Sequence, residues 1–167
     1  ILDAAILLKE HKEIQFFLYG AGYQEEDLKK YKEEHHIDNV HFKGRVNKRF
    51  IPGILSRGNL NMLTGPSDRV SEYGMSMNKM FDYMMAAKPI IQAIDAGNNL
   101  VGEADCGIDV EPDNVGEISK AILALKSMPE EERRRLGENG KKFVLSNHTY
   151  PVLGKRFFGI MNNLIKK

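Results

Sequence analysis

The chain has 167 residues, of which 42% are hydrophobic and 28% charged, a composition that suits one globular domain with a substantial core. Its 24 basic and 23 acidic residues give a formal net charge of +1, which argues against nucleic acid as a partner. No apolar run approaches the roughly 18 residues of a membrane span. Cys106 is the only cysteine, so an internal disulfide and a cysteine-built zinc site are excluded, and a reducing, cytoplasmic compartment is expected.

The first residues, 1–13, are amphipathic and enter a helix directly, without a starting methionine or a capping segment. We therefore interpret the sequence as a piece of a longer protein. Further along, a short apolar run, a turn and an amphipathic helix recur. The predicted strands are 14–19, 39–44, 59–64, 89–94 and 106–111. The predicted helices after the first are 25–35, 50–56, 77–87, 98–103, 114–127, 129–145 and 150–165.

Strands that alternate with helices predict parallel strands joined by right-handed crossovers. The expected fold class is α/β, with an open, mostly parallel sheet and helices on both faces. Residues 1–167 show no internal repeat and no low-complexity linker, so a single domain is expected. In such sheets ligands bind beyond the carboxyl ends of the strands.

The loop 65–76 leads into the stretch SEYGMSMNKMFDYMMAAKPII, residues 71–91. If Ser76 caps the following helix, the remaining free N–H groups and the positive end of the helix dipole form an anion site that suits a phosphate. Gly74 would let the ligand approach the backbone closely. The helix should carry polar side chains on one face and core side chains on the other, namely Asn78, Lys79 and Asp82 opposite Met77, Met80, Phe81 and Met84.

Spacing alone leaves a plainer interpretation open, in which Ser76 is only a cap and Lys79 and Asp82 form a surface pair. Gly20 and Gly22 resemble a phosphate-binding turn, but Glu25 occupies the position of the third glycine, and a tight turn alone explains them. The basic loop 43–49 suits either phosphates or solvent. The sequence contains no convincing metal cluster, and we expect neither a metal nor another cofactor.

The order of these motifs resembles the C-terminal half of the GT-B glycosyltransferases, in particular the family called group 1 or family 4. The similar segments cover nearly the whole chain: FFLYGAG (16–22), NVHFKGRV (39–46), GMSMNKMFDYMMAAKPII (74–91) and CGIDVEPDN (106–114). The resemblance implies a Rossmann-like domain that binds a nucleotide-diphosphate sugar. It also implies that the family's first strand of this half, with the Arg and Lys residues that grip the diphosphate, precedes Ile1.

The resemblance places the base against Arg45 and Val46, the diphosphate near Gly74, Met75 and Ser76, and the ribose hydroxyls at Asp82. The family often has two glutamates eight positions apart. Asp82 occupies the second of these positions and Gly74 the first, while Glu72 is a possible substitute at a different spacing. Lys79 and the Ser76 backbone are candidates for stabilising the leaving diphosphate. The donor-binding set is Gly20, Gly22, Arg45, Val46, Gly74, Met75, Ser76, Lys79 and Asp82.

The function implied is the donor-binding half of a glycosyltransferase that moves a sugar from a nucleotide diphosphate to an acceptor hydroxyl. The acceptor would be recognised by an N-terminal domain outside this sequence, so this piece alone should be inactive, and any association with a membrane would come from that half. Three alternatives stay open: a nucleotide-sugar epimerase of the same architecture, a non-catalytic nucleotide-binding or partner-binding module, and a degenerate domain that keeps only a scaffold.

Overall fold

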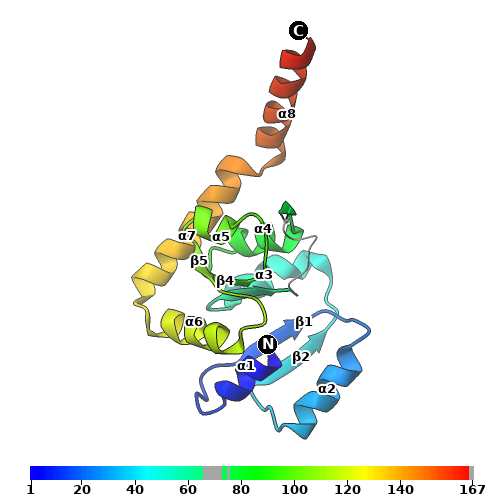
Figure 1. Cartoon of the computed structure of the whole chain (residues 1–167), viewed down its shortest axis with the longest axis vertical. Helices are drawn as coiled ribbons and strands as arrows, with labels where there is room; N and C mark the ends of the chain where they lie inside the picture. Colours follow the sequence, from blue (N-terminus) through cyan, green and yellow to red (C-terminus); the bar gives the residue numbers. More distant parts are fainter. Residues whose placement is uncertain (66–72, 75, 166–167) are drawn as a thin grey trace.

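The computed structural model describes residues 1–65, 73–74 and 76–165 (Figure 1). The strands are β1 (Phe16–Tyr19), β2 (Val40–Gly44), β3 (Asn61–Thr64), β4 (Ile90–Ala93) and β5 (Gly107–Asp109). The helices before β4 are α1 (Leu2–Leu7), α2 (Glu25–Glu34), the 3-10 turn η1 (Lys48–Phe50), α3 (Ile51–Arg57) and α4 (Asn78–Met85). After β4 follow α5 (Leu100–Glu103), α6 (Val115–Ser127), α7 (Glu130–Asn147) and α8 (Tyr150–Ile165). Each predicted strand and helix is present; α8 has the predicted ends, and the ends of the others are shifted.

The five strands form two parallel sheets, β1-β2 and β3-β4-β5. In the larger sheet Asn61 pairs with Ile90, and Gln92 of β4 pairs with Asp109 of β5. This confirms the predicted α/β class with parallel strands. The prediction of one sheet needs correction, because β1 and β3 are the edge strands of separate sheets and do not bond to each other.

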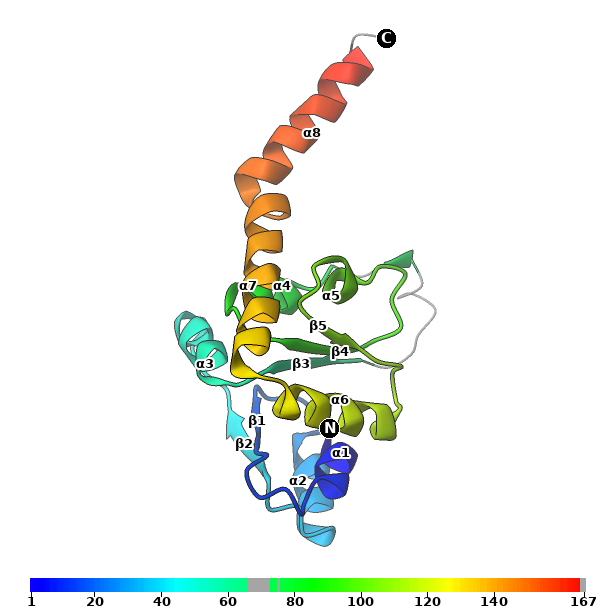
Figure 2. The same ribbon diagram turned by 90° about the vertical axis from the view of Figure 1, so that its left-hand side faces the viewer.

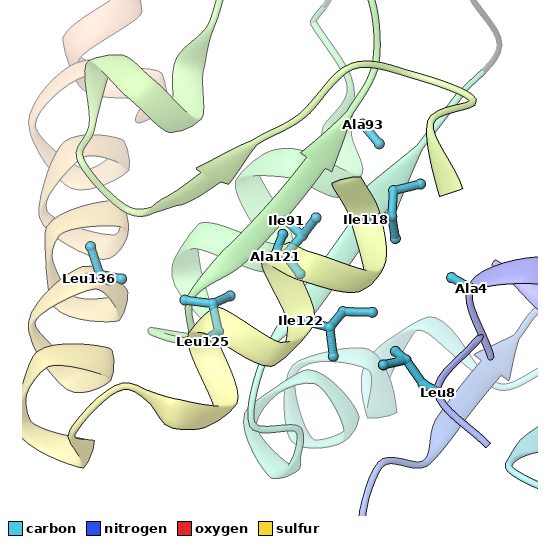
Figure 3. Packing of buried hydrophobic residues seen from close by; sticks show 9 residues of the cluster. All are labelled: Ala4, Leu8, Ile91, Ala93, Ile118, Ala121, Ile122, Leu125 and Leu136. Carbon is cyan, nitrogen blue, oxygen red and sulfur yellow. The ribbon is translucent and has the colours of Figure 1, made fainter. Parts of the chain in front are cut away.

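The larger sheet has helices on both faces (Figure 2). On one face, α6 packs its apolar side chains against β4, and α1 packs beside α6. Figure 3 shows this cluster, in which Ile118, Ala121, Ile122 and Leu125 of α6 lie between two residues of β4, Ile91 and Ala93, and two at α1, Ala4 and the C-cap Leu8. All of these residues are buried, and Leu136 of α7 closes one end of the cluster.

The opposite face of the larger sheet is covered by α4, α5 and α7 (Figure 2). Alternation along β4 sends Ile90 and Ile94 to this face, whereas Ile91 and Ala93 point to α6. Met84 is fully buried here, so the helix that begins at the candidate site is anchored in this core.

The smaller sheet differs from the prediction because one of its faces is open. Leu2 and Ala5 of α1 pack with Val40 on the covered face. On the other face Phe17 is 53% exposed, and its ring stacks on the imidazole of His41 with the centroids 5.0 Å apart. The two sheets are held together by α1, which contributes side chains to the cores of both, rather than by strand pairing.

The C-terminal helix α8 extends away from the body of the domain (Figures 1 and 2). Its described side chains are exposed or half-buried, and they include large apolar residues such as Leu153, Phe157, Ile160 and Leu164. Among the described residues, no helix combines the length and apolar character needed to cross a membrane.

Candidate functional site

The beginning of α4 brings together most of the residues that the sequence assigned to the diphosphate and the ribose. Gly74, Ser76, Lys79 and Asp82 all lie on the chain that enters this helix and along its first turns, and all are exposed. Gly74 has a φ of +98°, a backbone conformation that L side chains rarely adopt. Glycine is therefore required there by the backbone. Met75 of the predicted set lies outside the described residues, as does position 72, the possible glutamate substitute.

The predicted cap needs correction. The N-cap of α4 is Met77, with φ −88° and ψ 126°, and its side chain makes no capping hydrogen bond. The first turn is closed by the N–H of Met80, which donates to the carbonyl of Met77 at 3.0 Å. Ser76 thus precedes the N-cap. The reason is packing: Met77 lies against the core formed by Met80 and its neighbours, and this contact sets where the helix begins.

The two faces of α4 are as predicted. Asn78, Lys79 and Asp82 are exposed, while Met80 and Met84 are 3% and 0% exposed. In the described part of the chain no ion pair joins Lys79 to Asp82. The surface pair that the plainer interpretation required is therefore absent there, and both charges face solvent beside the helix start.

The remaining predicted residues lie at the carboxyl ends of β1 and β2. The N–H of Gly20 donates to the carbonyl of Gly44 at 2.9 Å, which joins the two strand ends, and Gly20 adopts a φ of +140°. Gly22 and Arg45 are exposed, and Val46 is half-buried. No hydrogen bond or ion pair between described residues connects this group to the start of α4, so the structure places the predicted set in two groups.

A polar network beside α4 was not predicted. Nε2 of the buried Gln92 donates to Oδ1 of Asp109 at 2.9 Å, and Nδ2 of Asn99 donates to Oδ2 of the same carboxylate at 2.8 Å. Oδ1 of Asn99 accepts from the N–H of Gly102 at 2.7 Å and so caps α5. The available signal in the sequence was a polar residue inside each of two apolar strands, PIIQAI and CGIDVE.

This network borders a small pocket, about 10 Å³ in volume, at the carboxyl ends of β3 and β4. Its wall combines side chains from the start of α4, from β3 and β4, and from the segment between β4 and α5: Leu63, Met77, Met80, Gln92, Ile94, Ala96, Asn98 and Leu100. Gly74 lies beside this wall, because a Cβ at Gly74 would be 3.3 Å from Oδ1 of Asn98. The start of α4 and the segment after β4 therefore face each other.

Burial shapes the ionisation of groups around the site. Desolvation raises the pKa of the Asp109 carboxyl, and the hydrogen bond from Gln92 partly opposes this shift. Burial also raises the pKa of Tyr83 on α4, with a smaller contribution from the charge of Asp82. In the part of the chain that the structure describes, no cluster of three or more His, Cys, Asp or Glu residues could hold a metal ion.

The fold and the helix start over a parallel sheet define the class: a Rossmann-like α/β domain. The family model described as "Glycosyl transferases group 1" matches residues 1–143. The chain belongs to this family, as the motif resemblance predicted.

Solved structures show the same fold at low sequence identity. Sucrose-phosphate synthase from Thermosynechococcus elongatus is 18% identical with a TM-score of 0.71, over 99% of this chain and 43% of that one. HepE from Anabaena in complex with UDP is 16% identical with a TM-score of 0.73, over 96% of this chain and 44% of that one. The C-terminal domain of LpcC, a group 1 family protein of Francisella tularensis, is 16% identical with a TM-score of 0.71, over 89% of this chain and 77% of that one.

The chain spans less than half the length of the first and second of these proteins. A sequence comparison with curated proteins gives no match.

Proposed function

We propose that this chain is the donor-binding half of a glycosyltransferase that transfers a sugar from a nucleoside diphosphate to an acceptor hydroxyl. The observation that carries the proposal is the start of α4, where Gly74, with its positive φ, and the exposed Lys79 and Asp82 lie beside a pocket at the strand ends. Family membership and the UDP complex of HepE support a nucleotide as the ligand.

Each part of the α4 start has a chemical role in this proposal. Backbone N–H groups of the first turn and the helix dipole attract the diphosphate, and the side chain of the N-cap Met77 does not bond to them. Lys79 adds a positive charge that counters the charge developing on the leaving diphosphate. Asp82 accepts hydrogen bonds from the ribose hydroxyls. Arg45 and Val46 would contact the base from the other sheet, and the turn at Gly20 and Gly22 would complete the donor-binding set.

The predicted residues at the start of α4 and those at the ends of β1 and β2 belong to different sheets, so the complete site must extend across both. The sheets are not bonded to each other, and the family's first strand of this half is expected before Ile1. Acceptor recognition would come from a further N-terminal domain, so transfer requires the complete enzyme.

Titration calorimetry of the complete protein with UDP, GDP and ADP tests the proposal. We expect one nucleotide to bind more tightly than the others, and the matching nucleotide-sugar to lose its sugar to an acceptor during turnover. If none of the three nucleotides binds, the proposed function is wrong. A changed sugar still attached to its nucleotide would instead indicate the epimerase.

A further inference from the structure

We propose that Asp109 is a positioning residue for the donor site. Through Gln92 and Asn99 it holds the segment 94–99 opposite Gly74, and this segment forms the wall against which the glycosyl group of the donor lies. The inference rests on the proposed function, because it assigns the sugar end of that same site.

The first step is the geometry of the carboxylate. Both oxygens of Asp109 accept a hydrogen bond from a side-chain amide, one from Gln92 on the neighbouring strand and one from Asn99 at the end of the segment after β4. Gln92 and Asp109 are direct partners in the parallel register, and the N–H of Val110 donates to the carbonyl of Gln92 at 2.8 Å. The carboxylate is thus fixed to the rigid sheet and bonds from there to the segment.

The second step is the fit of Asn99. Its Oδ1 accepts from the N–H of Gly102, and a Cβ at Gly102 would lie only 3.0 to 3.2 Å from three atoms of the Asn99 side chain. A side chain at position 102 would push Asn99 away from Asp109. Because position 102 is glycine, the side chain of Asn99 can cap α5 and bond to Asp109 of the sheet at the same time. These two bonds fix the end of the segment 94–99.

The third step places the segment in the donor site. A nucleotide-sugar has its diphosphate between the nucleoside and the glycosyl group. Asp82, assigned to the ribose, lies farther along α4 from the helix start, whereas Asn98 lies across from Gly74 at the helix start. A diphosphate at Gly74 with its nucleoside toward Asp82 directs the glycosyl group toward Asn98. Ala96 and Asn98 line the adjoining pocket.

Burial makes the partner of Gln92 important. Gln92 is 5% exposed, so its side-chain amide needs a hydrogen-bond partner, and Asp109 supplies one. Asp109 itself is exposed at the end of the sheet, and partial desolvation raises the pKa of its carboxyl. The carboxylate therefore contributes the two hydrogen bonds that it accepts from the amides of Gln92 and Asn99.

The test compares single variants with a reciprocal exchange in the complete protein. Asp109→Asn leaves a single acceptor oxygen for the amides of Gln92 and Asn99, so one of the two hydrogen bonds is lost. Asn99→Asp sets two carboxylates against each other and loses the bond between these residues. The double variant Asp109→Asn with Asn99→Asp restores it, because the new amide donates to the new carboxylate. In that variant the carboxylate at position 99 still accepts from Gly102, and the amide oxygen at position 109 still accepts from Gln92.

The measured quantities are the Kd of the best-binding nucleoside diphosphate among UDP, GDP and ADP, and the Kd of its glucose ester. We expect each single variant to raise the Kd of the ester about tenfold, the loss typical of one hydrogen bond to a charged group. The Kd of the nucleoside diphosphate should change by less than about twofold, within the scatter of surface substitutions. The double variant should recover the affinity for the ester.

Asn98→Ala, which leaves all three hydrogen bonds of the network in place, keeps the test decisive if a single variant unfolds. This variant should bind the glucose ester more weakly and bind the nucleoside diphosphate as tightly as the unchanged protein does. Equal losses for both ligands, no loss for either, or a double variant as weak as the single ones would overturn the inference. Failure of the unchanged protein to bind any nucleoside diphosphate would instead overturn the proposed function on which it rests.

Discussion

Gly137 of α7 lies directly against the carbonyl of Ala87, so that a Cβ at position 137 would overlap the carbonyl oxygen and carbon of that residue. This contact sets the distance between α7 and the end of α4, the helix that carries the candidate site. The atoms that would have to move belong to the backbone, so the clash has no cheap relief.

Gly137→Ala should therefore destabilise the domain, by about 1 to 3 kcal/mol or more in the free energy of unfolding. Urea unfolding followed by circular dichroism measures this change. Gly154→Ala is the matched control: Gly154 also lies inside a helix, but nothing is within 4 Å of its added Cβ. There the substitution should stabilise by up to about 1 kcal/mol through helix propensity. Equal effects at both positions would contradict the packing argument.

Ala87 ends α4 in the left-handed conformation, with a φ of +53°. For an L residue this conformation costs about 1 to 2 kcal/mol, and glycine avoids the cost. We expect Ala87→Gly to raise the urea midpoint, which thermal unfolding can verify independently. Ala86→Gly, one residue earlier at a φ of −72°, should lower it, because glycine there only adds freedom to the unfolded chain.

Cys106 is fully buried, and burial, helped by the charge of Asp105, raises the pKa of its thiol to about 12 from an ordinary 9.0. The folded chain should therefore resist iodoacetamide at pH 8 to 9 while the urea-unfolded chain reacts, as mass spectrometry can show. Above pH 9.0 the unfolded thiol loses its proton before the folded one does. Stability should then fall as the pH rises toward 12, less steeply in Cys106→Ala.

Arg133 closes the end of α6. Its Nη1 lies 3.2, 3.0 and 2.7 Å from the carbonyl oxygens of Leu125, Lys126 and Met128. Arg133→Met should lower the free energy of unfolding by about 1 to 3 kcal/mol, since these carbonyls lose a charged donor. Arg134→Met, at the exposed neighbouring position, should stay within about 0.5 kcal/mol of the unchanged chain. A similar loss in both variants would show that helix charge, not capping, matters.

Lys79→Ala and Asp82→Ala test the α4 start as a nucleotide site. Each should weaken binding of the preferred nucleoside diphosphate by about 1 to 3 kcal/mol, the range for hydrogen bonds to charged groups. Calorimetry on the complete protein measures the change. Lys142→Ala, an exposed lysine on α7, is the matched control and should leave affinity unchanged. Unaltered affinity in both α4 variants would favour the non-catalytic module or the scaffold.

Local pattern was sufficient to predict each strand and helix, because apolar periodicity reflects which face of an element is buried. The two faces of α4 illustrate this: exposed Lys79 and Asp82 and buried Met80 and Met84 follow from spacing alone. The residue at which α4 begins did not follow from the spacing. Met77 rather than Ser76 is the N-cap, since its side chain packs into a core that the local sequence does not reveal.

The sequence by itself determined the α/β class, the family resemblance and the residues at the start of α4, because these depend on periodicity and on motifs within one segment. Only the tertiary structure decided that the strands form two sheets and that Gln92 and Asn99 share the carboxylate of Asp109. These features join residues from separate strands and loops, and strand order and side-chain contacts arise from packing between segments that no local pattern encodes.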